Sequence, residues 1–318
     1  MKDINDLLLN NSKARFWQAY FGAKPYAPEG IVCGDELWDE YTAYLSHRKQ
    51  SSVNYPWEKL TEMTGGIRKK EVVLLTAGSG VAKTTFAMAI HSHLMLKGHK
   101  VAGLYLESSP ALTVMDMLSP FVGTNLRYNK AEVSSDEQHQ IFVENFKDKL
   151  FLMSNNWNGE WESVKKDIRY FRTMGCEYII LDHISRLVSG METGDERRAL
   201  DNIAHQLKAL SEELNVGIIA ISHLKRPEGK AHEEGGQTSL AQLRGSAGLA
   251  QLADIVIGLE RNGQAEDERI RNTTTFRILK NRWLGLTGKA GEVFYNKDTC
   301  QLEEIFEDVT EESEETDF

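Results

Sequence analysis

Cysteine, proline and long apolar runs are scarce in this sequence of 318 residues. The three cysteines, Cys33, Cys176 and Cys300, are far apart and show no Cys-x-x-Cys or Cys/His spacing. A disulfide framework and a zinc module are therefore excluded, and we expect reduced thiols. No apolar run approaches the roughly 20 residues that a membrane span needs. The first residues also have no long apolar core, so we expect neither a signal peptide nor a membrane anchor.

Linkers are equally scarce, since the chain has six prolines and no Pro- or Gly-rich stretch. With 41% hydrophobic and 26% charged residues, the composition is that of a soluble globular protein, either one large α/β domain with appendages or two small domains. The net charge is −10, but nine acidic residues lie between Glu303 and Asp317, and no Lys or Arg follows Lys297. The acidity therefore belongs mainly to the tail and does not exclude a basic surface for nucleic acid.

Strand-like and helix-like segments alternate from about residue 60. We expect strands at 71–76, 101–107, 150–155, 178–183, 215–223 and 254–260, and helices at 84–97, 110–120, 135–148, 160–174, 195–214 and 239–252. Several strands are apolar throughout, as in sheets that are covered on both faces. The pattern predicts an α/β fold with a doubly wound, mostly parallel sheet. The segments 273–283 and 291–305 read as antiparallel strands at one edge, with a turn at 296–299.

The two ends of the chain differ from this pattern. Residues 34–49 place Leu37, Trp38 and Tyr41 at helical spacing, and this amphipathic helix is followed by a loop-like tether. Its apolar stripe needs a partner, either its own domain or a neighbouring copy of the chain. The acidic tail ends in Phe318 and is either a solubilising segment or a docking peptide whose acids steer and whose Phe anchors.

One stretch, 71-EVVLLTAGSGVAKTTF-86, has the order of a phosphate-binding loop: strand, Gly-containing turn, Lys-Thr, helix. The usual pattern is G-x-x-x-x-G-K-[ST], and Ala77 and Ala82 stand at its two glycine positions. A positive φ at Ala82 costs about 1 kcal/mol, which a fold can absorb. Lys83 is expected to contact the β/γ-phosphates, and the Thr84 hydroxyl to bind Mg²⁺. The predicted nucleotide-binding residues of this loop are Gly78, Ser79, Gly80, Val81, Ala82, Lys83, Thr84 and Thr85.

Polar residues end three of the other expected strands. Asp182 would support the Mg²⁺, Glu107 would deprotonate an attacking water, and His223 would sense the γ-phosphate. Taken singly, each also suits a structural role: a helix-capping Asp, a surface carboxylate, a hydrogen-bonded His. Together beside one phosphate-binding loop they indicate a site for nucleotide hydrolysis.

Basic residues follow His223 directly, in the segment 223–237: Lys225, Arg226, Lys230 and His232. Such a loop suits contact with a phosphate backbone without base specificity. Three glutamates dilute its charge, so an ordinary solvated loop is the alternative.

A second basic group lies in 277-RILKNR-282, at the expected edge strand. Arg277, Lys280 and Arg282 are either exposed edge charges or a source of an arginine that enters a neighbouring subunit's site.

Several blocks resemble a known family. They include TAGSGVAKTT, LYLES, YIILDHIS, ISHLKRPEGKAHEEGG, LRGSAGLAQLAD, LERN, RILKNRWLGLTG and GEVFYNKDTC, and together they cover most of the chain. They are similar to the helicase half of the replicative primase–helicase of podovirus-type bacteriophages and, more distantly, to the ring helicases Twinkle and DnaB, which have a RecA-like core.

The resemblance implies a homo-hexamer, with a heptamer as the alternative, that hydrolyses ATP or dTTP with Mg²⁺ and moves 5′-to-3′ on single-stranded DNA in its channel. It assigns Lys83, Glu107 and His223 catalytic roles and makes Arg282 an arginine finger. Arg261 and Tyr295 would hold the base, with Lys280 near the nucleotide and Gln251 linking nucleotide state to DNA. The DNA-binding residues would be Lys225, Arg226 and Lys230, and a second channel loop would span residues 185–198. Ala82 in place of Gly and Ala250 where relatives can carry Arg are departures.

The resemblance also implies a division of the chain. Residues 1–33 resemble the end of a primase TOPRIM domain, 34–58 a linker helix and tether, 59–306 the RecA-like NTPase domain, and 307–318 a polymerase-docking tail that ends in Phe318. The chain is then a fragment of a primase–helicase or a helicase-only relative, acting in the host cytoplasm. The alternatives are a RecA-type recombinase and a nucleotide-dependent scaffold that does not hydrolyse.

Overall fold

The computed structural model describes residues 13–22, 34–48, 52–78, 80–128, 133–154, 160–189, 193–225, 227, 229–243 and 247–306. It divides the chain into two compact units, residues 1–50 and 51–318. Among the described residues, no helix is long and apolar enough to cross a bilayer.

The first unit contains two helices, α2 (Lys13–Phe21) and α3 (Gly34–Arg48). Helix α3 confirms the helix expected at 34–49, and Leu37, Trp38 and Tyr41 are exposed on it. Helix α2 was not predicted. Its Trp17, Tyr20 and Phe21 rings contact one another with centroids 5.4–5.7 Å apart, a local cluster in a segment whose sequence is poorly periodic.

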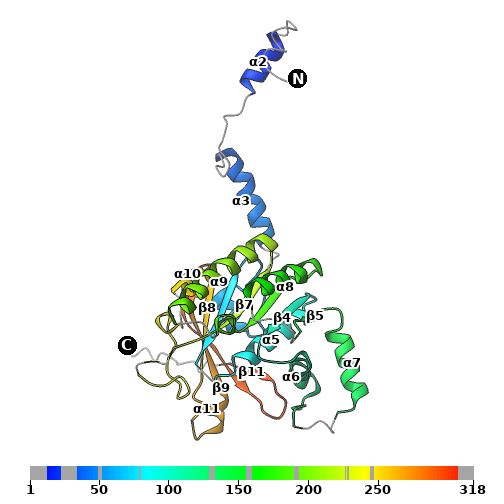
Figure 1. Cartoon of the computed structure of the whole chain (residues 1–318), viewed down its shortest axis with the longest axis vertical. Helices are drawn as coiled ribbons and strands as arrows, with labels where there is room; N and C mark the ends of the chain where they lie inside the picture. Colours follow the sequence, from blue (N-terminus) through cyan, green and yellow to red (C-terminus); the bar gives the residue numbers. More distant parts are fainter. Residues whose placement is uncertain are drawn as a thin grey trace, which may run out of the picture. The chain divides into compact units, whose positions relative to one another are not determined.

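The second unit is built on a nine-stranded sheet in the order β11-β10-β9-β8-β3-β7-β6-β4-β5 (Figure 1). Its parallel strands are β3 (Val72–Ala77), β4 (Val101–Tyr105), β5 (Leu150–Leu152), β6 (Tyr178–Asp182), β7 (Gly217–His223) and β8 (Ile255–Glu260). The antiparallel edge consists of β9 (Thr273–Asn281), β10 (Gly288–Tyr295) and β11 (Leu302–Ile305). The predicted doubly wound, mostly parallel sheet with antiparallel edge strands is confirmed.

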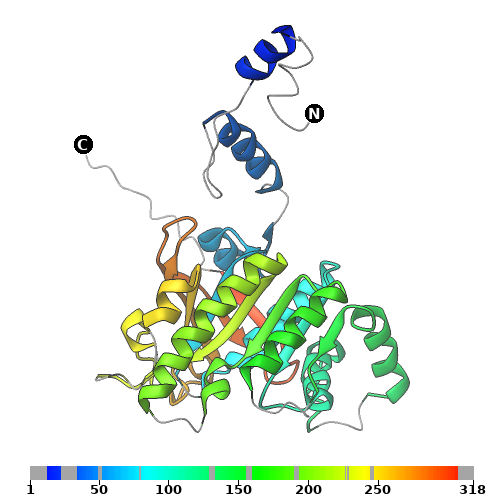
Figure 2. The ribbon, with the colours of Figure 1, turned by 45° about the horizontal axis from the view of Figure 1, so that its top comes forward.

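Helices cover both faces of the sheet, so alternate strand residues enter different cores. Val73 and Leu75 pack in the core beneath α5 (Lys83–Leu96) and α6 (Pro110–Val122), with α7 (Ser135–Asn145) at its margin. Val72 and Leu74 pack in the core beneath α8 (Trp161–Thr173), α9 (Thr193–Leu214) and α10 (Ala247–Leu252). Figure 2 shows α8 and α9 lying across the near face, with α5 behind the sheet. The carboxyl ends of the parallel strands therefore meet at one edge, where ligands bind in such sheets.

Some elements differ from the expectation. The helix expected at 239–252 is instead a 3₁₀ turn, η2 (Leu240–Gln242), and the separate short helix α10. Helix α6 continues past Pro120 to Val122. Four short elements were not predicted: β1 (Ser52–Val53) and its partner β2 (Ile67–Arg68), α4 (Glu58–Thr64) and α11 (Glu268–Asn272). Tyr55 and Trp57 were expected in a tether, but both are buried in the second unit. Trp57 packs there between Phe86 and Phe276.

Candidate nucleotide site

The loop between β3 and α5 lies at the carboxyl edge of the sheet. Gly78 is required by close packing, because a Cβ there would lie 2.3 Å from Cβ of His232. Gly80 has φ 75°, and Ala82, directly before the helix, has φ 55° and ψ 33°. The sequence-based expectation of a positive φ at Ala82 is therefore met. Ser79 lies outside the described residues.

Lys83, Thr84 and Asp182 converge at the first turn of α5. The Thr84 hydroxyl donates to Oδ2 of Asp182 over 2.5 Å, and Nζ of Lys83 donates to the carbonyl of Gly78 over 2.7 Å. Burial lowers the pKa of Lys83 to about 8, although the carboxylates of Asp182 and Glu107 oppose the shift. Burial also raises the pKa of Asp182, against the hydrogen bond from Thr84. A buried cation and a buried carboxylate thus face the position where a helix N-terminus attracts phosphate.

Glu107 and His223 occupy strand ends on either side of Asp182. His223 is the last residue of β7 and pairs in register with Ala77 of β3. Glu107 lies two residues beyond the end of β4, in a turn that the Leu106 N–H fastens to the Asp182 carbonyl over 2.8 Å. The side chain of Glu107 is 63% exposed, so a water has access to its carboxylate. The three predicted strand-end residues therefore lie at one edge of the sheet.

A hollow of about 170 Å³ lies beside the phosphate-binding loop. Its lining includes Ala82, Thr85, Arg261 and Tyr295, so the structure brings together the loop and the two residues expected to hold a base. Nε of Arg261 donates to the carbonyl of Arg271, which fixes the guanidinium against α11.

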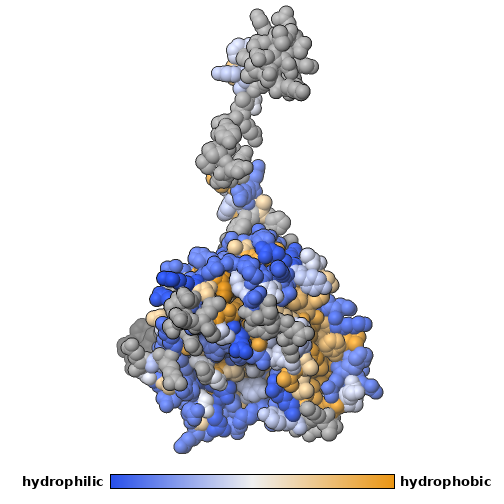
Figure 3. Space-filling model, in the orientation of Figure 1, coloured by the Kyte–Doolittle hydropathy of each residue, from blue (hydrophilic) through white to orange (hydrophobic). Residues whose placement is uncertain are grey.

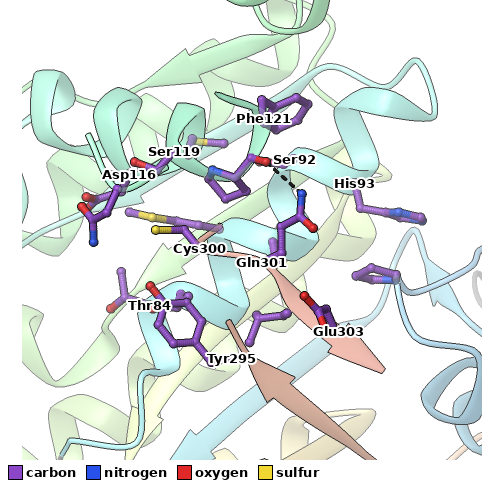
Figure 4. A pocket seen from close by; sticks show the side chains of 18 of the residues that line it. Thr84, Ser92, His93, Asp116, Ser119, Phe121, Tyr295, Cys300, Gln301 and Glu303 are labelled. Carbon is purple, nitrogen blue, oxygen red and sulfur yellow. Dashed lines mark hydrogen bonds between the residues drawn. The ribbon is translucent and has the colours of Figure 1, made fainter. Parts of the chain in front are cut away.

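Tyr295 is also a wall of a larger groove of about 600 Å³. Figure 4 shows this groove between α5, α6 and the β10–β11 hairpin, with Thr84 and Tyr295 at one end and Phe121 and His93 at the other. Gln301 crosses it and donates to the carbonyl of Pro120. The nucleotide site is therefore continuous with a second, mostly apolar hollow.

Gln251, Lys280 and Arg282 form a separate cluster at the opposite end of the sheet. Arg282 Nη2 donates to the Gln251 carbonyl over 2.5 Å, and Lys280 Nζ donates to the carbonyls of Ala250, Gln251 and Ala253, each over 2.7 Å. Asn281 pairs with Ile255, which pairs with Val73, four residues before Ala77. At about 3.3 Å per residue this separates the cluster from the loop by roughly 13 Å along the strands. Arg282 cannot reach its own chain's phosphate-binding loop.

The segment after His223 folds back toward the phosphate-binding loop. The Lys225 N–H donates to the Gln242 carbonyl over 2.7 Å, and Lys225 and Lys230 are exposed, as DNA contact requires. Arg226 lies outside the described residues. His232, which the sequence places with the basic residues of this segment, is buried at 4% exposure. Its ring lies between the carbonyls of Lys225 and Gly236 and against Gly78, so it is not available to DNA.

The expected second channel loop at 185–198 is mostly helical. Residues 185–188 belong to the 3₁₀ helix η1 (Ile184–Val188), and α9 begins at Thr193. Residues 190–192 lie outside the described residues. The side chains of Ile184, Leu187 and Val188 are buried. The spacing of these apolar residues therefore favours a helical turn over a loop.

The chain was compared with known proteins. Residues 53–304 match the family described as the DnaB-like helicase C terminal domain. The DNA helicase/primase of Enterobacteria phage T3 is 34% identical over 314 residues, which are 95% of this chain and 54% of that protein. A solved structure described as an ATPase domain superposes with a TM-score of 0.72 at 19% identity, covering 88% of this chain and 100% of that one. A DnaB-like replicative helicase, solved to describe its interactions with primase, gives 0.68 at 17% identity, with 95% and 74% covered.

These comparisons confirm the RecA-like α/β fold expected from sequence. The chain spans about half the length of the curated relatives it matches.

Proposed function

Since the chain belongs to the DnaB-like helicase C-terminal domain family, as its motifs indicated, we propose that it is the NTP-hydrolysing motor of a replicative DNA helicase. It hydrolyses a nucleoside triphosphate at a site shared between subunits of a ring. The ring moves 5′-to-3′ along single-stranded DNA and separates the duplex at a replication fork.

One observation carries this proposal: the carboxyl edge of the sheet joins a phosphate-binding loop to a carboxylate and to a basic loop. Lys83 and Thr84 bind the triphosphate, Glu107 accepts a proton from the attacking water, and His223 lies between the γ-phosphate position and the exposed Lys225 and Lys230. Contact with DNA on that loop is thereby connected to the chemistry. A RecA-type recombinase and an inert scaffold share the fold, and turnover and unwinding distinguish them.

The residues present fit a magnesium ion that arrives with the nucleotide. Oxygen donors of Thr84 and Asp182 lie 2.5 Å apart at the first turn of α5, and Mg²⁺ prefers oxygen ligands completed by substrate phosphates. Among the described residues, no group of three or more His, Cys, Asp or Glu could hold a metal by itself. When bound, the ion supplies charge neutralisation at the phosphates, and the chain contributes the Thr84 hydroxyl and the Asp182 carboxylate.

The ring requires an interface that each subunit offers to the next. Helix α3 exposes Leu37, Trp38 and Tyr41, and we assign to it the role of packing on an adjacent subunit. Figure 3 shows apolar surface over the α6–α7 part of the second unit, where a hollow is lined by Ala111, Val114, Met115, Leu118, Leu126 and Gln138. Six or seven copies joined in this way form a closed ring.

A partner outside the ring is the replicative DNA polymerase. The acidic tail, which lies outside the described residues, would steer toward a basic patch, and Phe318 would anchor in it. Deleting Phe318 should weaken polymerase binding and leave unwinding of a preformed fork intact. Loss of unwinding would contradict this role.

The motor proposal is tested by phosphate release measured with and without single-stranded DNA across the NTPs. We expect hydrolysis that DNA stimulates, and we expect Lys83→Met to abolish it because the β/γ-phosphate contact is lost. Arg169→Met, which removes an exposed cation of α8 paired with Glu213 of α9, is the control and should hydrolyse normally. Nucleotide binding without DNA-stimulated hydrolysis would contradict the proposal and favour the scaffold. Strand exchange without fork unwinding would favour the recombinase.

A further inference from the structure

His183, which directly follows Asp182, lies in the middle of a row of three side chains at the carboxyl edge. Its Nε2 is 3.3 Å from Oε1 of Glu107. On its other side, its ring meets the ring of His223 edge-to-face, with centroids 4.3 Å apart and planes at 85°. The row Glu107–His183–His223 thus crosses the ends of β4, β6 and β7.

The burial of His183 leaves Glu107 as the partner of its polar side-chain contact. Its side chain is only 12% exposed, and its Nδ1 is buried with no hydrogen-bond partner among the described residues. The ring nitrogen that makes a polar side-chain contact is therefore Nε2, and that contact is with Glu107. Among the described residues, His183 is the side chain that contacts the carboxylate of Glu107. The carboxylate is otherwise open to solvent.

The other end of the row is fastened to the phosphate-binding loop and to the basic loop. His223 pairs with Ala77, and the N–H of Leu224 donates to the Ala77 carbonyl over 3.2 Å. The next residue, Lys225, begins the segment that exposes its cations. A displacement of this segment therefore moves His223, and the close ring contact passes that displacement to His183.

We propose that His183 is a positioning residue that makes hydrolysis respond to DNA. It holds the carboxylate of Glu107 in a defined orientation, and it shifts that carboxylate when DNA on the Lys225–Lys230 segment displaces His223. This inference rests on the proposed function, because it requires hydrolysis at this site and DNA on that segment. Sequence reasoning assigned His183 no role, although it stands directly after Asp182 in YIILDHIS.

Three variants separate the two contacts of His183. His183→Ala removes both, His183→Gln keeps an N–H near Glu107 but no ring, and His183→Phe keeps a ring against His223 but no donor. The quantities are kcat and KM for NTP hydrolysis with and without single-stranded DNA. In all three variants we expect the ratio of kcat with DNA to kcat without DNA to fall to about one, because the coupling between DNA and hydrolysis is lost. The KM for NTP should stay within about twofold of the wild type, because nucleotide binding is kept. The kcat without DNA should stay near the wild-type value in His183→Gln and fall in His183→Phe.

His99→Gln is the matched control. His99 also pairs with a glutamate, Glu177, over 2.8 Å, but at the opposite end of the strands, so its DNA stimulation should be that of the wild type. Wild-type stimulation in the His183 variants would overturn this inference and leave the proposed function standing. Equal loss of kcat with and without DNA would also overturn it, since that is the behaviour of a purely structural residue. Absence of stimulation in the wild type would overturn the proposed function and this inference with it.

Discussion

Ala82 holds a left-handed backbone conformation directly before Lys83, where the phosphate-binding pattern has glycine. A Cβ in that conformation costs about 1 to 2 kcal/mol. The loop therefore keeps its shape at the expense of local strain, which the buried strand and helix on either side offset.

Replacing Ala82 with Gly should relieve that strain. We expect Ala82→Gly to raise the free energy of unfolding by about 0.5 to 1 kcal/mol, the relief of strain less the entropy that Gly adds to the unfolded chain, with hydrolysis retained. Urea titration measures the stability and phosphate release the rate. Lys70→Gly is a matched control, since Lys70 has φ 63° in the turn before β3, and it should gain similar stability without a change in rate. A destabilised Ala82→Gly would contradict the strain argument.

For single residues, the sequence predicts a role where that role follows from the residues next to it in the chain. Lys83 and Thr84 follow from the loop pattern, and Asp182 follows from the apolar strand that precedes it. The burial of His232 cannot be predicted in this way. It depends on Gly78, which is distant in sequence and, because it has no side chain, leaves room for the His232 ring. Tertiary packing thus decides which of the basic residues after His223 are accessible.

Helix α5 is joined to β4 by a buried polar contact. Nδ1 of His91 lies 3.1 Å from the Tyr105 hydroxyl, and both side chains are buried. Burial lowers the pKa of His91 to about 3. The helix that begins with Lys83 and the strand that leads to Glu107 are therefore held together by a neutral histidine.

The His91 contact should make the fold acid-sensitive. The folded-state pKa lies below the ordinary value of about 6.5, so its stabilising effect is complete above pH 6.5 and decreases as the pH falls toward 3. Between pH 7 and pH 5 this amounts to a loss of about 2 kcal/mol. Thermal unfolding across this range should show a shallower pH dependence for His91→Gln than for the wild type. His139→Gln, on the exposed face of α7, should behave like the wild type, and parallel curves for all three would contradict the argument.

Elements buried on both faces were the most predictable from sequence. The β3, β6 and β7 segments are apolar runs bounded by polar residues, and their strands lie where expected. The separation of η2 from α10 was missed because the segment was taken as one helix, although Gly245 and Ser246 lie between the two elements. Short elements such as α4 are fixed by contacts with β9 and β10, which no local pattern reveals.

At the scale of the whole molecule, the residues proposed for the nucleotide site lie at two opposite ends of one sheet. Lys83, Glu107 and His223 lie at the carboxyl edge, whereas Lys280 and Arg282 lie near the start of β3 and β8. If the proposed roles of Lys280 and Arg282 hold, the site requires a second copy of the chain. A head-to-tail arrangement, which generates a ring, brings the two ends of neighbouring copies together.

The exposed stripe of α3 should be needed for that arrangement. Trp38→Ala and Tyr41→Ala, at rings whose centroids lie 5.6 Å apart, should each weaken assembly by about 2 kcal/mol, the loss expected for a buried aromatic anchor. Sedimentation velocity across protein concentrations measures the shift. Tyr170→Ala removes an exposed aromatic of α8 and should leave assembly unchanged. Identical oligomer distributions for all variants would remove α3 from the interface.

Mixing two inactive variants tests the shared site most directly. Glu107→Gln lacks the base and Arg282→Ala lacks the arginine, and each alone should not hydrolyse NTP. In mixed rings, about a quarter of the interfaces combine an intact Glu107 with an intact Arg282 from the neighbour. DNA-stimulated phosphate release should therefore recover to roughly a quarter of the wild-type rate at equal proportions, if the interfaces act independently. Rings that contain both variants and hydrolyse at no mixing ratio would contradict a site completed by Arg282 of a second copy.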